Sequence, residues 1–277
     1  MLRVGSVPYL VGRPLDLGLG DEPDIELSHA VPARLVAGLR DGSLDVALVS
    51  SIELFRRPGY AFLDGIGVSG ASYVSSVQVF LRKPLAEVRS VALDPSSRTA
   101  AALTQVTWPR DGQRPAFLEV APGSDPRQVP ADAWLRIGDP ALVESLEWVD
   151  AERTRVFNPS QAWAAQSGLP FIFAPWIVAP GVDIEPHLIS FAMAHARGLA
   201  ARAELAAQHA QKSALSAEQL THYLVQECHY APGAAMQPSL LAYRDAAAKL
   251  ELARGELTPR AIELPLLIPP DACEVLA

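Results

Sequence analysis

The chain has 277 residues, a formal net charge of −8 at pH 7, 49% hydrophobic residues and 19% charged residues. This composition is typical of a globular protein, and the length lies near the size at which one hydrophobic core divides into two, so we expect two lobes. The acidic balance argues against a nucleic-acid partner, while the lack of a long apolar run or a signal-peptide pattern argues against a membrane location and predicts the cytoplasm.

Short apolar runs alternate with helical segments in the first half of the chain, which predicts an α/β fold. Between the first two runs, Pro32 begins a segment that is apolar on one face, and Gly42 follows its end, as expected of a helix. The next run then reads as a parallel strand, and ligands of parallel sheets bind beyond the carboxyl ends of the strands. The apolar runs occupy residues 2–7, 44–49, 77–81, 91–93 and 134–137.

Candidate binding residues gather at the ends of these predicted strands. A helix is expected to begin just after Ser97, Arg98 and Thr99, where free backbone N–H groups and the helix dipole favour an anion. An arginine fork pairs well with a carboxylate, and an aromatic ring can stack on a flat ligand. The candidates for substrate binding are Tyr9, Arg13, Ser51, Ser76, Ser97, Arg98, Thr99, Gly138 and Trp176.

Two carboxylates are candidates for acid–base chemistry. Glu53 follows the second apolar run, and Asp139 lies in the turn after the fifth. Such a pair could move protons during a reaction, although Asp139 could equally cap its own turn.

The second half of the chain becomes mainly helical after Pro180. Helices are expected at 190–213, 217–229 and 239–252, the second opened by a capping box of Ser216 and Gln219. Apolar segments at 79–81 and 177–178 are interpreted as two crossings between lobes. This interpretation assigns residues 1–82 and 178–277 to lobe I and residues 83–177 to an inserted lobe II. The C-terminal helices could form the interface of a homodimer, and the sequence does not decide whether they do.

No cofactor or metal is expected. The sequence lacks G-x-G-x-x-G, G-x-x-x-x-G-K-[ST] and H-E-x-x-H, and its six histidines form no recognisable ligand pair with a carboxylate or cysteine. Cys228 and Cys273 are far apart in the sequence and lack a C-x-x-C spacing, so we interpret both as buried thiols.

Six blocks taken together resemble the chorismate dehydratase family. They are VPYLVGRPL (7–15), GSLDVALVSSIE (42–53), SSVQVFLRKPL (75–85), VALDPSSRT (91–99), LRIGDPAL (135–142) and SGLPFIFAPW (167–176). The resemblance implies an α/β fold similar to type II periplasmic binding proteins, with a ligand cleft between two lobes. It also implies a carbon–oxygen lyase without a cofactor, which removes water from the dicarboxylate chorismate to give 3-[(1-carboxyvinyl)oxy]benzoate in the futalosine route to menaquinone.

If the chain belongs to this family, the two carboxylates of chorismate would be bound by Arg98 and by the hydroxyl groups of Ser51, Ser76, Ser97 and Thr99. The enolpyruvyl carboxylate of the substrate could take the C3 proton itself, with Glu53 or Asp139 as alternatives. The family usually has Asn where this chain has Val11, and an apolar side chain cannot donate to a leaving hydroxyl. That role would pass to Tyr9, Arg13 or a serine, unless the protein is a non-catalytic binding protein for an aromatic or enolpyruvyl carboxylate. The related dihydroxynaphthoate synthases share the fold but have a different N-terminal pattern, SPCPNDTF.

Overall fold

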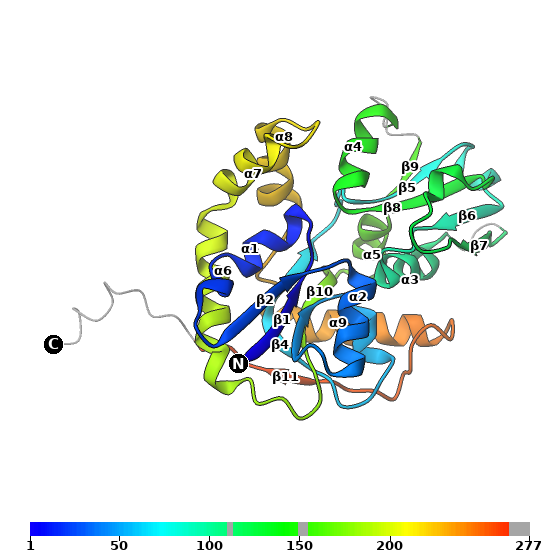
Figure 1. Cartoon of the computed structure of the whole chain (residues 1–277). Helices are drawn as coiled ribbons and strands as arrows, with labels where there is room; N and C mark the ends of the chain where they lie inside the picture. Colours follow the sequence, from blue (N-terminus) through cyan, green and yellow to red (C-terminus); the bar gives the residue numbers. More distant parts are fainter. Residues whose placement is uncertain (110–112, 149–154, 266–277) are drawn as a thin grey trace.

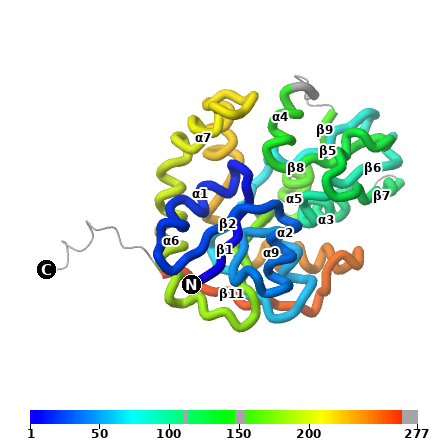
Figure 2. Tube along the Cα trace, viewed as in Figure 1, coloured from blue at the N-terminus to red at the C-terminus, as the bar shows by residue number. Residues whose placement is uncertain are grey.

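Two mixed β-sheets, each flanked by helices, divide the chain into two lobes (Figure 1). The computed structural model describes residues 1–109, 113–148 and 155–265. The N-terminal and C-terminal parts of the described chain meet in the first lobe, whereas the middle of the chain forms the second lobe (Figure 2). This arrangement agrees with the two-lobed α/β fold expected from the sequence.

The sheet of the first lobe has the strand order β11–β4–β10–β3–β1–β2 within the described residues. Strand β1 pairs in parallel with β2 and β3, and β10 runs antiparallel to β3 and β4. The parallel β1–β3 pair confirms the strand–helix–strand unit predicted around the helix that begins at Pro32. The strands are β1 Leu2–Ser6, β2 Ile25–His29, β3 Val46–Leu48, β4 Ala61–Gly70, β10 Phe171–Val178 and β11 Arg260–Ile262.

Helices α2 and α6 lie on opposite sides of this sheet (Figure 1). Gly42 ends α2 with a φ of 78°, a left-handed conformation that glycine adopts at little cost. Gly198 lets α6 approach α1 closely, because a Cβ atom there would overlap the backbone of Pro14. The helices of this lobe are α1 Arg13–Asp16, α2 Pro32–Asp41, α6 Leu188–Ala200, α7 Arg202–Ala210, α8 Ala217–His222 and α9 Met236–Ala248.

The sheet of the second lobe has the order β7–β6–β8–β5–β9 in the described part of the chain. Strand β6 is parallel to β7 and β8, and β5 is antiparallel to β8 and β9. The strands are β5 Val77–Leu81, β6 Ser90–Leu93, β7 Ala116–Glu119, β8 Ala133–Ile137 and β9 Val156–Phe157, and the helices are α3 Arg98–Thr107, α4 Gly138–Trp148 and α5 Pro159–Ser167.

The chain changes sheets earlier than the sequence analysis expected at both crossings. Residues 79–81 and 177–178 are not crossings but parts of β5 and β10, and they are apolar because both strands are buried. The crossings are the segments that precede these strands, at residues 71–76 and 168–170. Strand β5 therefore belongs to the second sheet and all of β10 to the first.

The C-terminal helices match the expected positions with two interruptions. The predicted helix at 190–213 is divided between α6 and α7 near Ala201. The capping box of Ser216 and Gln219 is confirmed at the start of α8, but the helix continues beyond His222 as a π-helix over Tyr223–Glu227. π-Helical turns need a specific packing environment, so the sequence pattern alone did not reveal this one.

Candidate functional site

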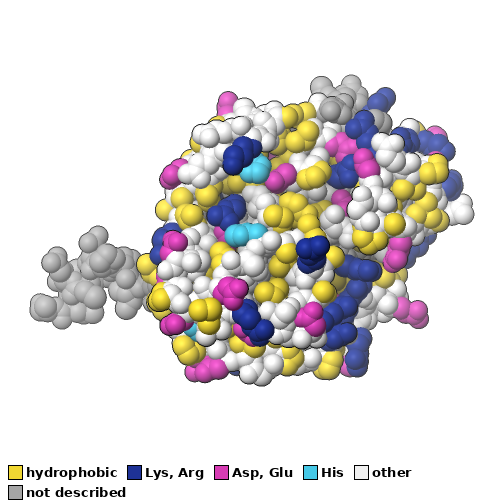
Figure 3. Space-filling view, viewed as in Figure 1, with side chains coloured by type: hydrophobic (Ala, Val, Ile, Leu, Met, Phe, Trp, Pro, Cys, Tyr) yellow, Lys and Arg dark blue, Asp and Glu magenta, His cyan; other side chains and the backbone are white. Residues whose placement is uncertain are grey.

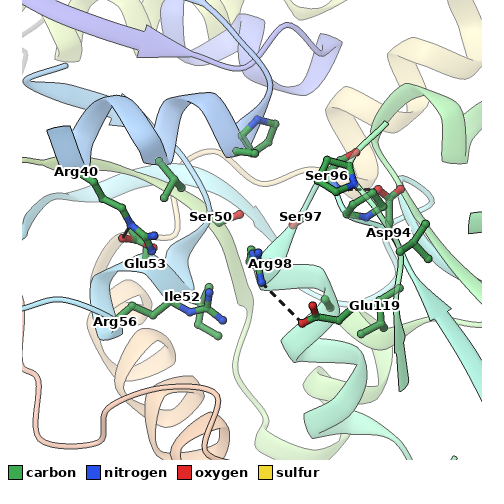
Figure 4. A pocket seen from close by; sticks show the side chains of 18 residues that line it. Arg40, Ser50, Ile52, Glu53, Arg56, Asp94, Ser96, Ser97, Arg98 and Glu119 are labelled. Atoms are coloured by element: carbon green, nitrogen blue, oxygen red, sulfur yellow. Dashed lines mark hydrogen bonds and ion pairs between the residues drawn. The ribbon is translucent and has the colours of Figure 1, made fainter. Parts of the chain in front are cut away.

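A pocket of about 360 Å³ lies between the two lobes. Its first-lobe wall comes from α2 and the 3-10 helix Ser51–Phe55 that follows β3. Its second-lobe wall comes from the turn between β6 and α3 and from the end of β7. Figure 4 shows the polar side chains of these walls facing one another across the pocket. The site therefore lies beyond the ends of strands β3 and β6, where the sequence predicted a ligand.

The turn between β6 and α3 is held in place by Asp94. One carboxylate oxygen accepts a hydrogen bond from the Ser96 amide at 2.8 Å, and the other accepts one from the Ile137 amide at 3.1 Å. Ser97 then caps α3 by accepting the Ala100 amide at 3.2 Å. The helix expected just after Ser97, Arg98 and Thr99 is present but begins two residues earlier, at Arg98, and Ser97 and Arg98 line the pocket.

Thr99 joins the two lobes beneath the pocket. Its hydroxyl accepts a hydrogen bond from the Ile52 amide at 3.1 Å and lies 3.5 Å from the Ser51 hydroxyl. Its carbonyl oxygen accepts a hydrogen bond from Tyr243 on α9 at 3.1 Å. The structure thus brings Ser51 and Thr99 together, but both are buried and hydrogen-bonded within the protein.

Glu53 forms a two-pronged ion pair with Arg40 in the first-lobe wall. Its two oxygens accept from the Arg40 guanidinium at 2.8 and 2.7 Å, and the Glu53 side chain is only 3% exposed. The hydrogen bond with Glu53 raises the pKa of Arg40, against the opposite effect of burial. The charges of this pair cancel each other inside the wall.

Two other arginines leave positive charge in the pocket. Arg98 makes a long ion pair of 3.9 Å with the exposed Glu119. Arg56 is half-buried, and its guanidinium makes no hydrogen bond or ion pair with any described residue. Burial lowers the pKa of Arg56, and the charge of Arg98 lowers it further. The two guanidinium groups point toward the same space in Figure 4.

Three further candidates occupy another part of the boundary between the lobes. The Tyr9 ring packs against Gly138, where an added Cβ would lie 3.4 Å from it and where φ is 68°. Burial raises the pKa of Tyr9, with further contributions from Asp94 and Asp139. The Asp139 carboxylate lies 3.4 Å from the His209 ring, and burial raises the pKa of Asp139. None of the three lines the pocket that contains Arg56.

The remaining candidates are also separate from this pocket. Ser76 is buried and accepts a hydrogen bond from Tyr223 at 2.7 Å. Trp176 is fully buried in the first-lobe core, where it meets Phe191 edge-on at 5.1 Å, so its ring does not face the pocket. Arg13 lies on α1 beside Asp16 and His29, at 3.1 and 2.8 Å.

Arg40 and Arg56 were not identified from the sequence. Both belong to segments already considered, α2 and the stretch after β3, and an arginine just beyond a strand end is a usable signal for anion binding. Only the spatial arrangement shows that the Arg40 guanidinium is paired with Glu53, whereas the Arg56 guanidinium has no ion pair within the described residues.

No group of three or more His, Cys, Asp or Glu side chains in the described part of the chain could hold a metal ion. None of the described helices is both long and apolar enough to cross a membrane.

Comparison with known proteins identifies the family. A family model described as menaquinone biosynthesis matches residues 2–249. The chorismate dehydratase of Thermus thermophilus is 31% identical over 210 residues, which cover 71% of this chain and 77% of that protein. The chain belongs to the chorismate dehydratase family. The chorismate dehydratase of Campylobacter jejuni is 28% identical over 61% of this chain and 64% of that protein.

Solved structures confirm the fold expected from the family. Protein AF1704 of Archaeoglobus fulgidus aligns with a TM-score of 0.71 and 13% identity over 91% of this chain and 98% of that one. The alkanesulfonate-binding protein SsuA of Xanthomonas axonopodis pv. citri, bound to MOPS, aligns with a TM-score of 0.67 and 16% identity over 95% and 98%. This chain therefore has a periplasmic-binding-protein-like fold with two lobes.

Proposed function

We propose that this protein is a cytoplasmic carbon–oxygen lyase that removes water from chorismate to give 3-[(1-carboxyvinyl)oxy]benzoate, in the futalosine route to menaquinone. The observation that carries the proposal is the pocket between the lobes in a chain of the chorismate dehydratase family. One wall carries Arg56, whose guanidinium has no ion pair within the described residues, and the other carries Arg98, which has only a long ion pair with the exposed Glu119. Chorismate carries two carboxylates, and the pocket offers arginines, serine hydroxyls and the start of α3 to receive them.

The main contribution of the protein to this reaction is to orient the substrate. The hydroxyl leaves C4 and the proton leaves C3, so that one water is released and the ring becomes aromatic. Aromatisation makes this elimination strongly downhill. Holding the ring and its two carboxylates in one geometry therefore accounts for much of the rate enhancement that we expect.

The geometry supports proton removal by the substrate rather than by Glu53. Both Glu53 oxygens accept hydrogen bonds from Arg40, so this carboxylate is engaged within the first-lobe wall. Asp139 lies outside the pocket lining. The enolpyruvyl group of chorismate is attached to C3 itself through the ether oxygen, so its carboxylate can accept the C3 proton within the same molecule.

Ser97 is our candidate donor to the departing hydroxyl. Its oxygen accepts the Ala100 amide, which leaves the hydroxyl proton free to point into the pocket that Ser97 lines. Val11, which stands where the family usually has Asn, is half-buried against the first-lobe core and offers no donor. A serine in the second-lobe wall would replace that function.

Incubation of the purified protein with chorismate tests the proposal. We expect the ultraviolet spectrum to change to that of a substituted benzoate and the product mass to be lower by one water. The alternative is a non-catalytic binding protein, which Val11 and the similarity to an alkanesulfonate-binding protein favour. Protection against thermal unfolding by chorismate without any turnover would support that alternative and contradict the lyase.

A further inference from the structure

The Arg56 side chain is an unusual feature of the wall between the lobes. It is half-buried and lines the pocket, and its guanidinium makes no hydrogen bond or ion pair within the described residues. The nearby Glu53 acts on it through charge alone and is itself hydrogen-bonded to Arg40. Desolvation of an unpaired charge is unfavourable, and buried charges in proteins are normally paired. The missing counter-charge is therefore expected to come from a ligand.

The neighbouring charges show why Arg56, rather than Arg40, is able to bind an anionic ligand. Arg40 is neutralised by Glu53 through two short hydrogen bonds. Arg98 approaches from the opposite lobe, and its charge disfavours the protonated form of Arg56, so two like charges share one space. An anion placed between them would replace this repulsion with two attractions.

The surface around the pocket favours the arrival of an anion. Figure 3 shows Lys and Arg side chains gathered beside α2, along the line where the lobes meet. The chain as a whole has a net charge of −8. A local positive strip on an acidic protein directs anions to the pocket and raises their association rate.

From these contacts we infer that Arg56 and Arg98 together bind one carboxylate of the substrate, and that this shared carboxylate links the two lobes. The inference rests on the proposed function for the identity of the ligand, a dicarboxylate of the chorismate type. Arg56 supplies the first-lobe half of the site and Arg98 the second-lobe half. The guanidinium forks can each donate two hydrogen bonds to the same carboxylate.

The test compares Arg56→Gln, Arg98→Gln and the double variant by calorimetric titration with the product, 3-[(1-carboxyvinyl)oxy]benzoate, which binds without turnover. Each single variant is expected to bind about tenfold to hundredfold more weakly, as for the loss of charge-assisted hydrogen bonds. The double variant should have an affinity for the product only slightly below that of the single variant that binds it less tightly, because both arginines bind the same carboxylate. Arg57→Gln is the matched control, since Arg57 is adjacent, exposed and outside the pocket lining, and it should bind within about twofold of the wild type.

The unfolding temperature of each variant shows whether a loss of affinity comes from a loss of folding. Because the ligand-free protein holds Arg56 without a counter-charge, Arg56→Gln should unfold at the same temperature as the wild type or higher. Arg56→Lys should restore only part of the affinity, because an ammonium group keeps the charge but not the fork. A fall in unfolding temperature for Arg56→Gln would instead assign Arg56 a structural role.

The outcomes separate this inference from the proposed function. Unchanged product affinity in Arg56→Gln, with normal chorismate turnover, would overturn the inference and leave the function standing. Additive losses in the double variant would overturn the sharing of one carboxylate. Product binding that depends on Arg56 in a protein that never dehydrates chorismate would keep the anion site and overturn the function. A wild-type protein that binds no carboxylate would overturn both.

Discussion

Thr99 of the second lobe accepts a buried hydrogen bond from the backbone amide of Ile52 in the first lobe, at 3.1 Å. The contact joins the start of α3 to the 3-10 helix after β3, the two segments that form facing walls of the pocket. The Thr99 hydroxyl thus contributes to the relative position of these walls, together with the hydrogen bond from Tyr243 to the Thr99 carbonyl oxygen.

Replacement of Thr99 by Val should weaken this junction. The variant keeps the shape of the side chain but leaves the Ile52 amide without its acceptor, so the free energy of unfolding should fall by about 1–3 kcal/mol. Thr99→Ser retains the hydroxyl and is the control for loss of the methyl group alone. Urea unfolding of the three proteins measures the difference, and equal stability of Thr99→Val and wild type would show that the contact contributes nothing.

Glu53→Gln tests whether this carboxylate removes a proton or pairs with Arg40. We expect the free energy of unfolding to fall by about 1–3 kcal/mol, less than for a fully buried pair because Arg40 is partly exposed. Turnover should stay within about tenfold of the wild type, since loss of a general base costs about a hundredfold or more.

Arg40→Gln provides the matched control for Glu53→Gln. It removes the same ion pair but retains the carboxylate, so it should destabilise the protein to a similar extent. Steady-state kinetics together with thermal unfolding would separate the two roles. A loss of turnover of about a thousandfold in Glu53→Gln, with unchanged stability, would make Glu53 the base.

Asp139 should make the protein less stable as pH rises. Burial raises its pKa in the folded state above the ordinary value of 3.8. The folded protein therefore binds more protons than the unfolded chain between the two pKa values, and the free energy of unfolding falls as pH rises through that interval. Asp139→Asn removes this titration. The stability of the variant relative to wild type should increase with pH from about pH 4 upward, as measured by denaturant unfolding across a pH series. A relative stability that falls with pH would show that the charged form is favoured in the native state.

Cys228 should be chemically inert in the folded protein. Burial raises the pKa of its thiol to about 12, and only the thiolate reacts readily, so about one molecule in ten thousand is reactive at pH 8. The second cysteine, Cys273, lies outside the described residues, and the test uses Cys273→Ser so that one thiol remains. A disulfide reagent should label this variant only after denaturation. Rapid labelling of the native variant would contradict the buried environment.

The local parts of the site could be predicted from the sequence, because short-range chemistry determines them. The helix start near residues 97–99 and the turn around Asp139 are examples: Ser97 caps α3, and the adjacent Gly138 has a φ of 68° at the start of α4. The role suggested for Trp176 depended on the direction of its side chain. The register of β10 against β3 pairs Trp176 with Leu48, and its ring meets Phe191 in the core. That register depends on long-range pairing that no local pattern specifies.

The pairing of the charged side chains could not be predicted from the sequence either. Glu53 was a reasonable candidate base until the structure placed both its oxygens against Arg40. Arg56 acquires its importance only from the absence of a described partner and from the approach of Arg98 across the lobe boundary. The first relationship arises from the packing of α2 against the 3-10 helix within the first lobe, and the second from the packing of the two lobes.

A single-turnover reaction with the purified protein in excess over chorismate tests the central claim most directly. The products are identified by mass and by proton magnetic resonance. The account predicts one aromatic product that has lost one water and retains the enolpyruvyl ether, which identifies 3-[(1-carboxyvinyl)oxy]benzoate. Recovery of unchanged chorismate, or a product from which the enolpyruvyl group has been cleaved, would contradict it.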